Sequence, residues 1–278
     1  MQTVITTDEL RIKLSKLERP VGFVPTMGYL HEGHLSLVKR AREENPAVVV
    51  SIFTNPTQFA PNEDLDNYPR DINRDCDLLE KAGVDLVWIP TVEVMYPEGY
   101  QTWIDVDGLS QLLEGTYRPT HFRGVATVVG KLFNAVSPDK AYFGQKDAQQ
   151  AAVIMQMVRD LNFQIDIIIC PIVREPDGVA MSSRNTYLDK EERAAARCLS
   201  KGLFLARDAF QGGERRPEVL KKIVKDEVEK ESLAKLQYVS CADPRSLKEL
   251  ENEIQDCLIS MAVFVGGTRL IDNIVLGK

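Results

Sequence analysis

Short apolar segments alternate with helix-like segments through the first part of this 278-residue chain. The apolar segments are rich in Val, Ile and Phe on both faces, which is typical of strands buried in a parallel sheet. Amphipathic patterns separate them, so we expect helices to cover both faces of that sheet. An α/β fold is therefore predicted, with strands at 21–25, 47–53, 84–90, 140–144 and 164–170 and helices at 34–45, 71–83, 124–139 and 147–162.

The pattern changes near residue 176. Helical patterns there are followed by strand-like segments instead of alternating with them, which indicates an α+β domain with a small sheet. The sequence thus predicts a larger domain over 1–175, with a parallel sheet and helices on both faces, and a smaller α+β C-terminal lid domain over 176–278. In the second domain we expect helices at 189–211 and 216–233 and strands at 236–244 and within 259–276.

Composition excludes several classes of protein. The net charge of −7 argues against an extended nucleic-acid partner, because affinity for phosphate backbones depends on Lys and Arg. No apolar run approaches the roughly 18 residues that span a bilayer, and the N-terminus lacks the pattern of a signal peptide. The five cysteines form no CxxC pair, which argues against a disulfide framework and a Cys-based zinc site. We expect a cytoplasmic protein that binds neither nucleic acid nor membranes.

Two of the three histidines stand three residues apart in PTMGYLHEGHLSLV (25–38), between a predicted strand and a helix expected to start near His34. The unpaired N–H groups and partial positive charge of a helix N-terminus favour a phosphate there. His31 and His34 can add imidazole donors to phosphate oxygens. Two other interpretations stay open: a metal site, for which His121 is the only further histidine, and a capped turn without a ligand.

Three further polar clusters follow predicted strands. Gln58 lies in the long connection 53–71, and its amide suits a hydroxyl or carboxylate ligand. Lys146 can bind phosphate beside Asp147, a candidate N-cap, and Ser182–Arg184 falls on a segment expected to be a flexible lid. Each cluster alone also fits an ordinary loop or a capped helix. Together they would line one edge of a parallel sheet, which favours a triphosphate site, although the chain has no P-loop motif.

The motifs PTMGYLHEGHLSLV, FTNPTQF, FGQKDAQQ and AMSSRN, in this order between about residues 20 and 190, resemble the pantothenate synthetase (pantoate–β-alanine ligase) family. The HxGH element is similar to the HIGH signature of the wider nucleotidylyltransferase superfamily, whose catalytic domain is a Rossmann-like sheet. The resemblance implies an enzyme that joins pantoate to β-alanine using ATP, through a pantoyl-adenylate, and releases AMP and pyrophosphate. It also implies a homodimer that needs Mg²⁺.

The resemblance further implies roles for individual residues. His34 would be the catalytic residue of general-acid type, assisted by His31, Lys146 and Arg184. Gln58 would hold pantoate and later β-alanine, and Gln150 would hold pantoate. ATP would contact Met27, Gly28, Tyr29, Leu30, His31, Glu32, Gly33, His34, Gly144, Gln145, Lys146, Asp147, Val173, Met181, Ser182, Ser183 and Arg184. Gln145 stands where Glu is commoner in the family, and the metal ligands are unassigned, with Asp71 and Asp75 as possible neighbours.

Two alternative functions are compatible with parts of this pattern. A nucleotidylyltransferase that transfers AMP to a phosphorylated acceptor would share the fold and the HxGH element. Its acceptor site would, however, require Lys or Arg to bind the phosphate, whereas this chain has the neutral amides of Gln58 and Gln150. A non-enzymatic nucleotide-binding module would leave the Ser-Ser-Arg segment without a purpose. We therefore favour the ligase.

Overall fold

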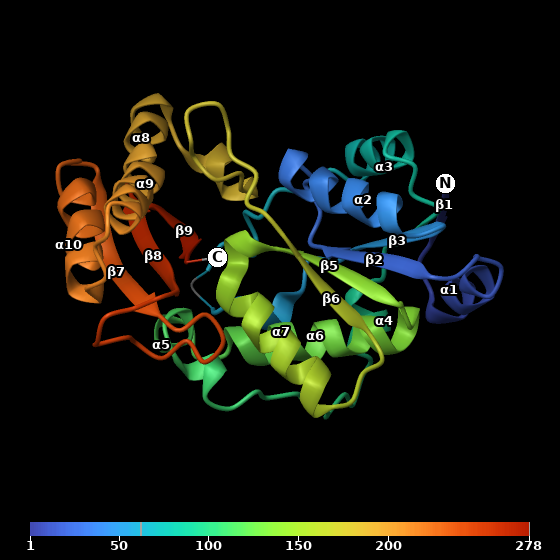
Figure 1. Cartoon of the computed structure of the whole chain (residues 1–278). Coiled ribbons are helices and arrows are strands. Elements are labelled where there is room, and N and C mark those ends of the chain that lie inside the picture. The colour runs from blue at the N-terminus through green and yellow to red at the C-terminus, as the bar shows by residue number, and fades with distance from the viewer. Residues whose placement is uncertain (62, 278) are drawn as a thin grey trace. The chain divides into compact units, whose positions relative to one another are not determined.

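The computed structural model describes residues 1–61 and 63–277, which form two compact units (Figure 1). The first unit contains Met1–Gly144 and Val153–Pro171, and the second contains Gln145–Ala152 and the chain from Ile172 onward. Residue 62, within the predicted connection 53–71, and residue 278, the predicted end of the C-terminal domain, lie outside the described residues. The chain therefore passes from one unit to the other more than once.

A six-stranded parallel sheet forms the centre of the first unit (Figure 1), which confirms the predicted Rossmann-like α/β fold. Its strand order is β1-β4-β3-β2-β5-β6. The order reverses between β2 and β5, and in open parallel sheets ligands bind beyond the C-terminal strand ends at such a reversal. The strands are β1 (Gln2–Val4), β2 (Val21–Thr26), β3 (Ala47–Ile52), β4 (Leu86–Trp88), β5 (Lys140–Gly144) and β6 (Asp166–Cys170).

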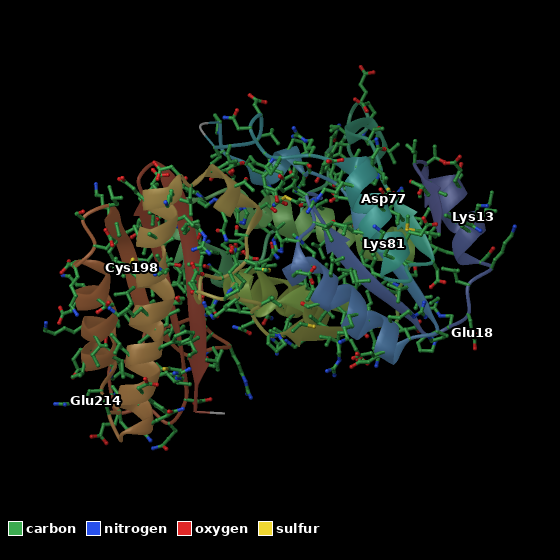
Figure 2. All side chains as sticks on the ribbon, turned by 90° about the horizontal axis from the view of Figure 1, so that it is seen from above. Lys13, Glu18, Asp77, Lys81, Cys198 and Glu214 are labelled. Carbon is green, nitrogen blue, oxygen red and sulfur yellow. The ribbon has the colours of Figure 1, made fainter. Side chains whose placement is uncertain are left out.

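Two helices cover one face of this sheet. α2 (Glu32–Glu44) and α3 (Ile72–Lys81) bury apolar side chains such as Leu37 and Leu79 against β2 and β3. On the opposite side of α3, Asp77 and Lys81 are exposed (Figure 2). This division of apolar and charged faces is the reason that the helical periodicity could be recognised in the sequence.

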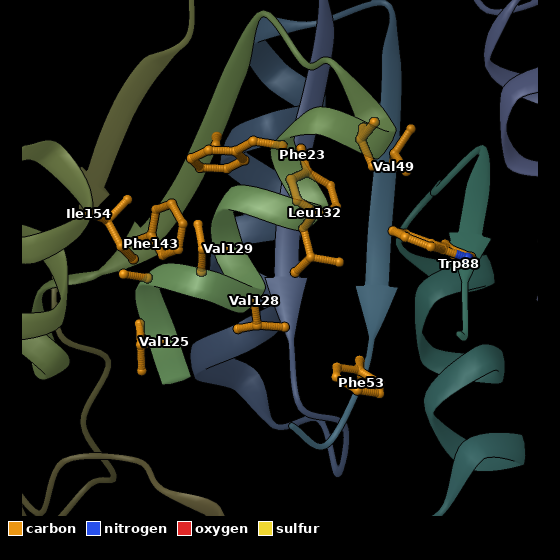
Figure 3. Close-up of a cluster of buried hydrophobic side chains, with 14 of the residues drawn as sticks. Phe23, Val49, Phe53, Trp88, Val125, Val128, Val129, Leu132, Phe143 and Ile154 are labelled. Carbon is orange, nitrogen blue, oxygen red and sulfur yellow. The ribbon is translucent and has the colours of Figure 1, made fainter. Parts of the chain in front are cut away.

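The other face carries α1 (Thr7–Leu14), α6 (His121–Val136) and the second half of α7 (Ala148–Asp160). α6 is apolar over most of its surface, and its valines and Leu132 pack among Phe23, Val49 and Phe143 of the sheet (Figure 3). Burying one such side chain contributes about 1.5–3 kcal/mol, so this layer fixes α6 firmly on the sheet. Shorter elements complete the unit: η1 (Pro56–Gln58), α4 (Val92–Met95), η2 (Leu109–Gln111) and α5 (Glu114–Tyr117).

The second unit contains a three-stranded antiparallel sheet, β7-β8-β9, which confirms the predicted α+β character. Two helices, α9 (Arg197–Gln211) and α10 (Pro217–Val228), share one apolar core with it. The strands are β7 (Ala234–Ala242), β8 (Cys257–Val265) and β9 (Thr268–Leu276). Short elements in this unit are η3 (Gln145–Asp147), η4 (Ser183–Tyr187) and α8 (Lys190–Ala195). Nowhere in the described part of the chain is a helix both long and apolar enough to cross a membrane.

Several predicted boundaries were wrong. α2 begins at Glu32 and not near His34, because His31 is its N-cap. The single helix predicted at 189–211 is two helices that meet at Ala196. The backbone of Ala196 is itself right-handed helical (φ −56°, ψ −18°), so no helix-breaking residue signals the boundary in the sequence. The prediction also missed β1 and α1, although the Thr6–Glu9 capping box is a recognisable start signal for α1.

Candidate active site

The segment between β2 and α2 makes a tight turn with left-handed backbone. Gly28 has φ +88° and Tyr29 has φ +51°. A Cβ atom at Gly28 would lie 3.0 Å from Ile52 Cγ2 and 3.2 Å from Asp75 Oδ2, in a conformation that L side chains rarely adopt. The turn therefore requires glycine at this position, and it delivers the chain directly to His31.

A buried carboxylate holds this turn. Asp75 of α3 is 1% exposed and accepts hydrogen bonds from Tyr29 N at 2.7 Å and Leu30 N at 2.8 Å. Its neighbour Arg74 donates to Leu30 O at 2.9 Å and lies over the Tyr29 ring. Burial raises the pKa of Asp75, and the two backbone donors oppose that rise. Asp75 is thus an anchor of the turn, a role that the sequence did not reveal.

His31 and His34 cap α2 reciprocally. His31 Nδ1 accepts from Gly33 N at 3.1 Å, and Nδ1 of His34 accepts from His31 N at 3.3 Å. Their ring centroids are 4.1 Å apart. Ser or Thr with Glu usually fills these two positions of a capping box, and here two imidazoles do so. The Nδ1 atom of each ring is therefore used to cap the helix, as the capped-turn interpretation expects.

This cap determines which ring nitrogen carries the proton. An Nδ1 atom that accepts a backbone hydrogen bond carries no hydrogen, so the neutral rings of His31 and His34 carry theirs on Nε2. Two Nε2–H donors therefore belong to the residues at the positive end of the α2 dipole. Such an arrangement can bind phosphate and stabilise negative charge that develops on its oxygens.

A metal site at these histidines is not supported. Among the described residues, no group of three or more His, Cys, Asp or Glu side chains could hold a metal ion. Both oxygens of Asp75 accept from the turn, and Asp71 caps α3 through its side chain. Mg²⁺ is usually held by one or two carboxylates together with substrate phosphates. The described residues therefore do not fit a magnesium ion held by the protein alone.

Gln58 lies at the end of η1 and is 8% exposed. Its Oε1 accepts from Asn55 Nδ2 at 3.1 Å, and its Nε2 contacts Met27 Sδ at 3.1 Å. These contacts fix the orientation of the amide and connect Gln58 to the start of the segment that leads to His31. The second N–H of Nε2 can donate to a carboxylate or hydroxyl oxygen of a ligand.

The position of η1 depends on residues that the sequence prediction missed. Asn55, 1% exposed, accepts from Tyr96 Oη at 2.9 Å and donates to Gly124 O at 3.2 Å. A Cβ atom at Gly124 would lie 2.5 Å from Thr57 O and 2.7 Å from Gln58 N, so α6 can approach η1 only through a glycine. Burial raises the pKa of Tyr96 to about 12, and its hydroxyl therefore keeps its proton at neutral pH.

The third histidine supports Gln58 from the backbone. His121 Nδ1 lies 2.8 Å from Gln58 O, and because a carbonyl only accepts, Nδ1 carries the proton. Arg118 donates to the same carbonyl at 3.4 Å and pairs with both oxygens of Glu63 at 2.7 and 2.5 Å. Burial lowers the pKa of His121 to about 4, and the charge of Arg118 acts in the same direction. His121 is therefore neutral at neutral pH.

Lys146 and Asp147 belong to the second unit. They lie in η3, and α7 begins immediately after them at Ala148. Lys146 Nζ is 3.8 Å from Asp147 Oδ1, while Gln145 Nε2 donates to Asn273 Oδ1 of β9 at 3.1 Å. Gln150 follows in the first turn of α7. The Lys146 segment is thus fastened to the C-terminal sheet, which the sequence did not predict.

The remaining predicted residues lie on a hairpin and a short helix. Met181 N donates to Val173 O at 3.0 Å across the hairpin, and Ser182 is the N-cap of η4. Asn185 Nδ2 donates to Ala180 O at 3.1 Å, which attaches η4 to the hairpin. The Ser182–Arg184 triplet was expected on a loop; in the structure Ser182 caps η4, and Ser183 and Arg184 lie in its first turn.

The predicted site residues therefore form two groups. The first unit holds the segment 27–34, Gln58 and Gly144, and the second holds Gln145–Asp147, Gln150, Val173 and Met181–Arg184. The contact between Met27 and Gln58 joins members of the first group. In chain order these segments lie at or after the ends of four strands of the parallel sheet, namely β2, β3, β5 and β6.

Comparison with known proteins decides between the families compatible with this geometry. A family model described as pantoate-beta-alanine ligase matches residues 2–275. The chain belongs to the pantoate-beta-alanine ligase family. Among its curated relatives, the pantothenate synthetase of Herpetosiphon aurantiacus is 54% identical over 277 residues, which cover 99% of this chain and 100% of that protein.

Solved structures agree with this assignment. The pantothenate synthetase of Thermus thermophilus superposes with a TM-score of 0.95 at 46% identity, covering 99% of each chain. The pantoate-beta-alanine ligase of Francisella tularensis, whose structure is described as a complex with beta-gamma ATP and beta-alanine, gives a TM-score of 0.81 at 36% identity, covering 99% of this chain and 97% of that one. The family predicted from the four motifs is confirmed.

Proposed function

We propose that this chain is an ATP-dependent ligase that condenses pantoate with β-alanine to form pantothenate, a precursor in coenzyme A biosynthesis. The pantoate carboxylate attacks the α-phosphorus of ATP, and the bond to pyrophosphate breaks to give pantoyl-adenylate. The amine of β-alanine then attacks the acyl carbon, loses a proton, and displaces AMP. Family membership supports this reaction, and the reciprocal His31–His34 cap is the structural observation that carries it.

The cap supplies what adenylation requires. Negative charge builds on phosphate oxygens as the carboxylate attacks and pyrophosphate departs, and donors fixed before the reaction stabilise that charge without reorganisation. In this proposal the Nε2–H groups of His31 and His34 are such donors, with His34 as the principal catalytic residue. Lys146 and Arg184 add positive charge to the phosphates, and the segments 27–34, 144–147, Val173 and 181–184 bind ATP. No protein nucleophile is needed.

The amide of Gln58 supports pantoate and β-alanine as substrates. A neutral amide can donate to a carboxylate and accept from a hydroxyl, which matches a small hydroxy acid. A phosphorylated acceptor would require a cation here, and Arg118, which donates to Gln58 O, is paired with Glu63. The nucleotidylyltransferase alternative is therefore not favoured. In the proposal Gln58 binds both acids in turn, and Gln150 binds pantoate.

Further parts of the proposal concern the assembly around this site. The region 176–278 would act as a lid domain on a catalytic domain formed by 1–175, which would protect the hydrolysable adenylate from water. Mg²⁺ would enter with ATP, bound to its phosphates, because the described residues offer no carboxylate cluster for it. We also propose a cytoplasmic homodimer. The five cysteines, all within the described residues, form no disulfide, which suits a reducing compartment.

Product analysis tests the proposed reaction. The purified protein is incubated with ATP, Mg²⁺, pantoate and β-alanine, and the products are quantified by mass spectrometry. Pantothenate, AMP and pyrophosphate should appear in equal amounts, and omission of any substrate should abolish pantothenate. Formation of ADP and phosphate, or transfer of AMP to a phosphate ester with no reaction of pantoate, would contradict the proposal.

A further inference from the structure

The side chain of Asn273 holds the backbone of the Lys146 segment. Asn273 is 2% exposed on β9, and its Nδ2 donates to Gln145 O at 3.0 Å and to Lys146 O at 2.8 Å. Its Oδ1 accepts from Gln145 Nε2 at 3.1 Å. Carbonyl oxygens only accept, so these partners allow one orientation of the Asn273 amide. Three hydrogen bonds therefore connect one buried side chain to two consecutive residues of η3.

Asn273 is itself held by an ion pair on the other face of β9. Side chains alternate along a strand, so Asp272 and Asn273 point to opposite faces of the sheet. Asp272, 2% exposed, receives two hydrogen bonds from Arg174, at 2.6 and 2.9 Å, and accepts from Asn273 N at 2.7 Å. A bidentate Arg–carboxylate pair is rigid in geometry as well as strong. The backbone from which Asn273 projects is thus fixed from both sides.

We propose that Asn273 is a positioning residue for the phosphate-binding segment, and that it acts through the backbone of Gln145 and Lys146. The inference rests on the proposed role of Lys146 at the ATP phosphates. A lysine side chain has many rotamers, so the direction of its charge depends on how well its backbone is fixed. Small displacements of groups that position a reacting phosphate slow reactions strongly. The C-terminal strand would therefore determine how precisely this part of the site receives ATP.

Two substitutions at Asn273 separate positioning from packing. Asn273→Asp keeps the size of the side chain but replaces the donating nitrogen with an oxygen that faces two carbonyl oxygens, whereas Asn273→Ala removes the side chain. We expect both variants to weaken ATP binding by roughly 5- to 50-fold, since hydrogen bonds to two backbone acceptors are lost.

The experiment compares ATP affinity by calorimetry with the two half-reactions. Adenylate formation should slow in the Asn273 variants, while transfer from preformed pantoyl-adenylate to β-alanine should stay near the wild-type rate. Gln145→Ala removes one of the same bonds from the η3 side, and it should shift ATP affinity in the same direction. Its effect should not add fully to that of Asn273→Ala, because the two residues share an interaction. Asn252→Ala, at an exposed position of the same unit, is the matched control and should behave as wild type.

Wild-type ATP affinity in Asn273→Asp and in Gln145→Ala would overturn the inference, as would equal losses in both half-reactions. Thermal unfolding of each variant identifies any general loss of the fold, and if the Asn273 variants are unfolded, a wild-type ATP affinity in Gln145→Ala still overturns the inference. ATP binding does not depend on pantoate chemistry. A wild-type protein that binds ATP but forms no adenylate with pantoate would contradict the proposed function, and the affinity comparison would still decide the role of Asn273.

Discussion

Replacement of Asp75 by Asn should loosen the turn that precedes His31 without altering the histidines themselves. The Asp75 carboxylate accepts from Tyr29 N and Leu30 N at 2.7 and 2.8 Å in a site that is 1% exposed. An Asn side chain keeps one acceptor and turns an NH₂ group toward the other backbone N–H. One charge-assisted bond, worth about 1.5–3 kcal/mol, is lost, and one buried donor is left facing another donor.

The neutral amide offsets part of this loss, because burial disfavours the charge of Asp75, as its raised pKa indicates. We therefore expect Asp75→Asn to lower the free energy of unfolding by about 1–3 kcal/mol. The larger effect should be on catalysis, since His31 follows the loosened turn directly. A misplacement of about 1 Å can slow a reaction about 100-fold, so adenylate formation should fall by one to two orders of magnitude.

The assay combines urea unfolding with single-turnover formation of pantoyl-adenylate at saturating ATP and pantoate. Asp77→Asn is the matched control: it makes the same chemical change at an exposed position of α3 (Figure 2) and should leave both quantities near their wild-type values. If Asp75→Asn formed adenylate at the wild-type rate, the carboxylate would not be what holds the turn in its active geometry.

Three further perturbations follow from the same geometry. His34→Ala should lower turnover by about 10²–10³-fold with a much smaller change in ATP affinity, by analogy with loss of an oxyanion donor; steady-state kinetics and calorimetry check this, and wild-type turnover would exclude the role. Gly124→Ala should displace Gln58, since the new Cβ would lie 2.5 Å from Thr57 O, and it should raise the KM for pantoate much more than the KM for ATP. A wild-type KM for pantoate in this variant would contradict the close approach. Burial lowers the pKa of His121 from its ordinary value of 6.5 to about 4, so the unfolded chain binds more protons than the folded one between these pH values. Up to about 3 kcal/mol of stability should therefore be lost as the pH falls from 6.5 to 4. His121→Gln should flatten that part of the stability curve in urea unfolding measured at several pH values.

Much of the fold was predictable because its signals are local. Segments such as 47–53 are apolar on both faces, and a strand with that composition needs helices on both sides. The N-cap Asp71 and the left-handed Gly83 just after the helix likewise marked the two ends of α3 in the sequence. β1 escaped prediction because three residues carry no periodicity.

The sequence proposed residues for the site, but it did not reveal the groups that hold them in place. HxGH, Gln58 and Lys146 stand in short motifs, whereas the groups that hold them come from distant parts of the chain. Asp75 is 46 residues from Tyr29, and Asn273 is 128 residues from Gln145. No sequence pattern marks such pairs, because only the folded backbone brings them together. The ring nitrogens that His31 and His34 use for the cap were likewise not predictable, since they depend on backbone geometry at one helix end.

Isotope exchange between pyrophosphate and ATP tests the central claim most directly, namely that pantoate is adenylated before β-alanine reacts. Labelled pyrophosphate should enter ATP when pantoate is present and β-alanine is absent, and Gln58→Ala should need far more pantoate for the same exchange rate. Exchange without pantoate, or exchange that requires β-alanine, would contradict the proposed order of chemistry and the assignment of Gln58.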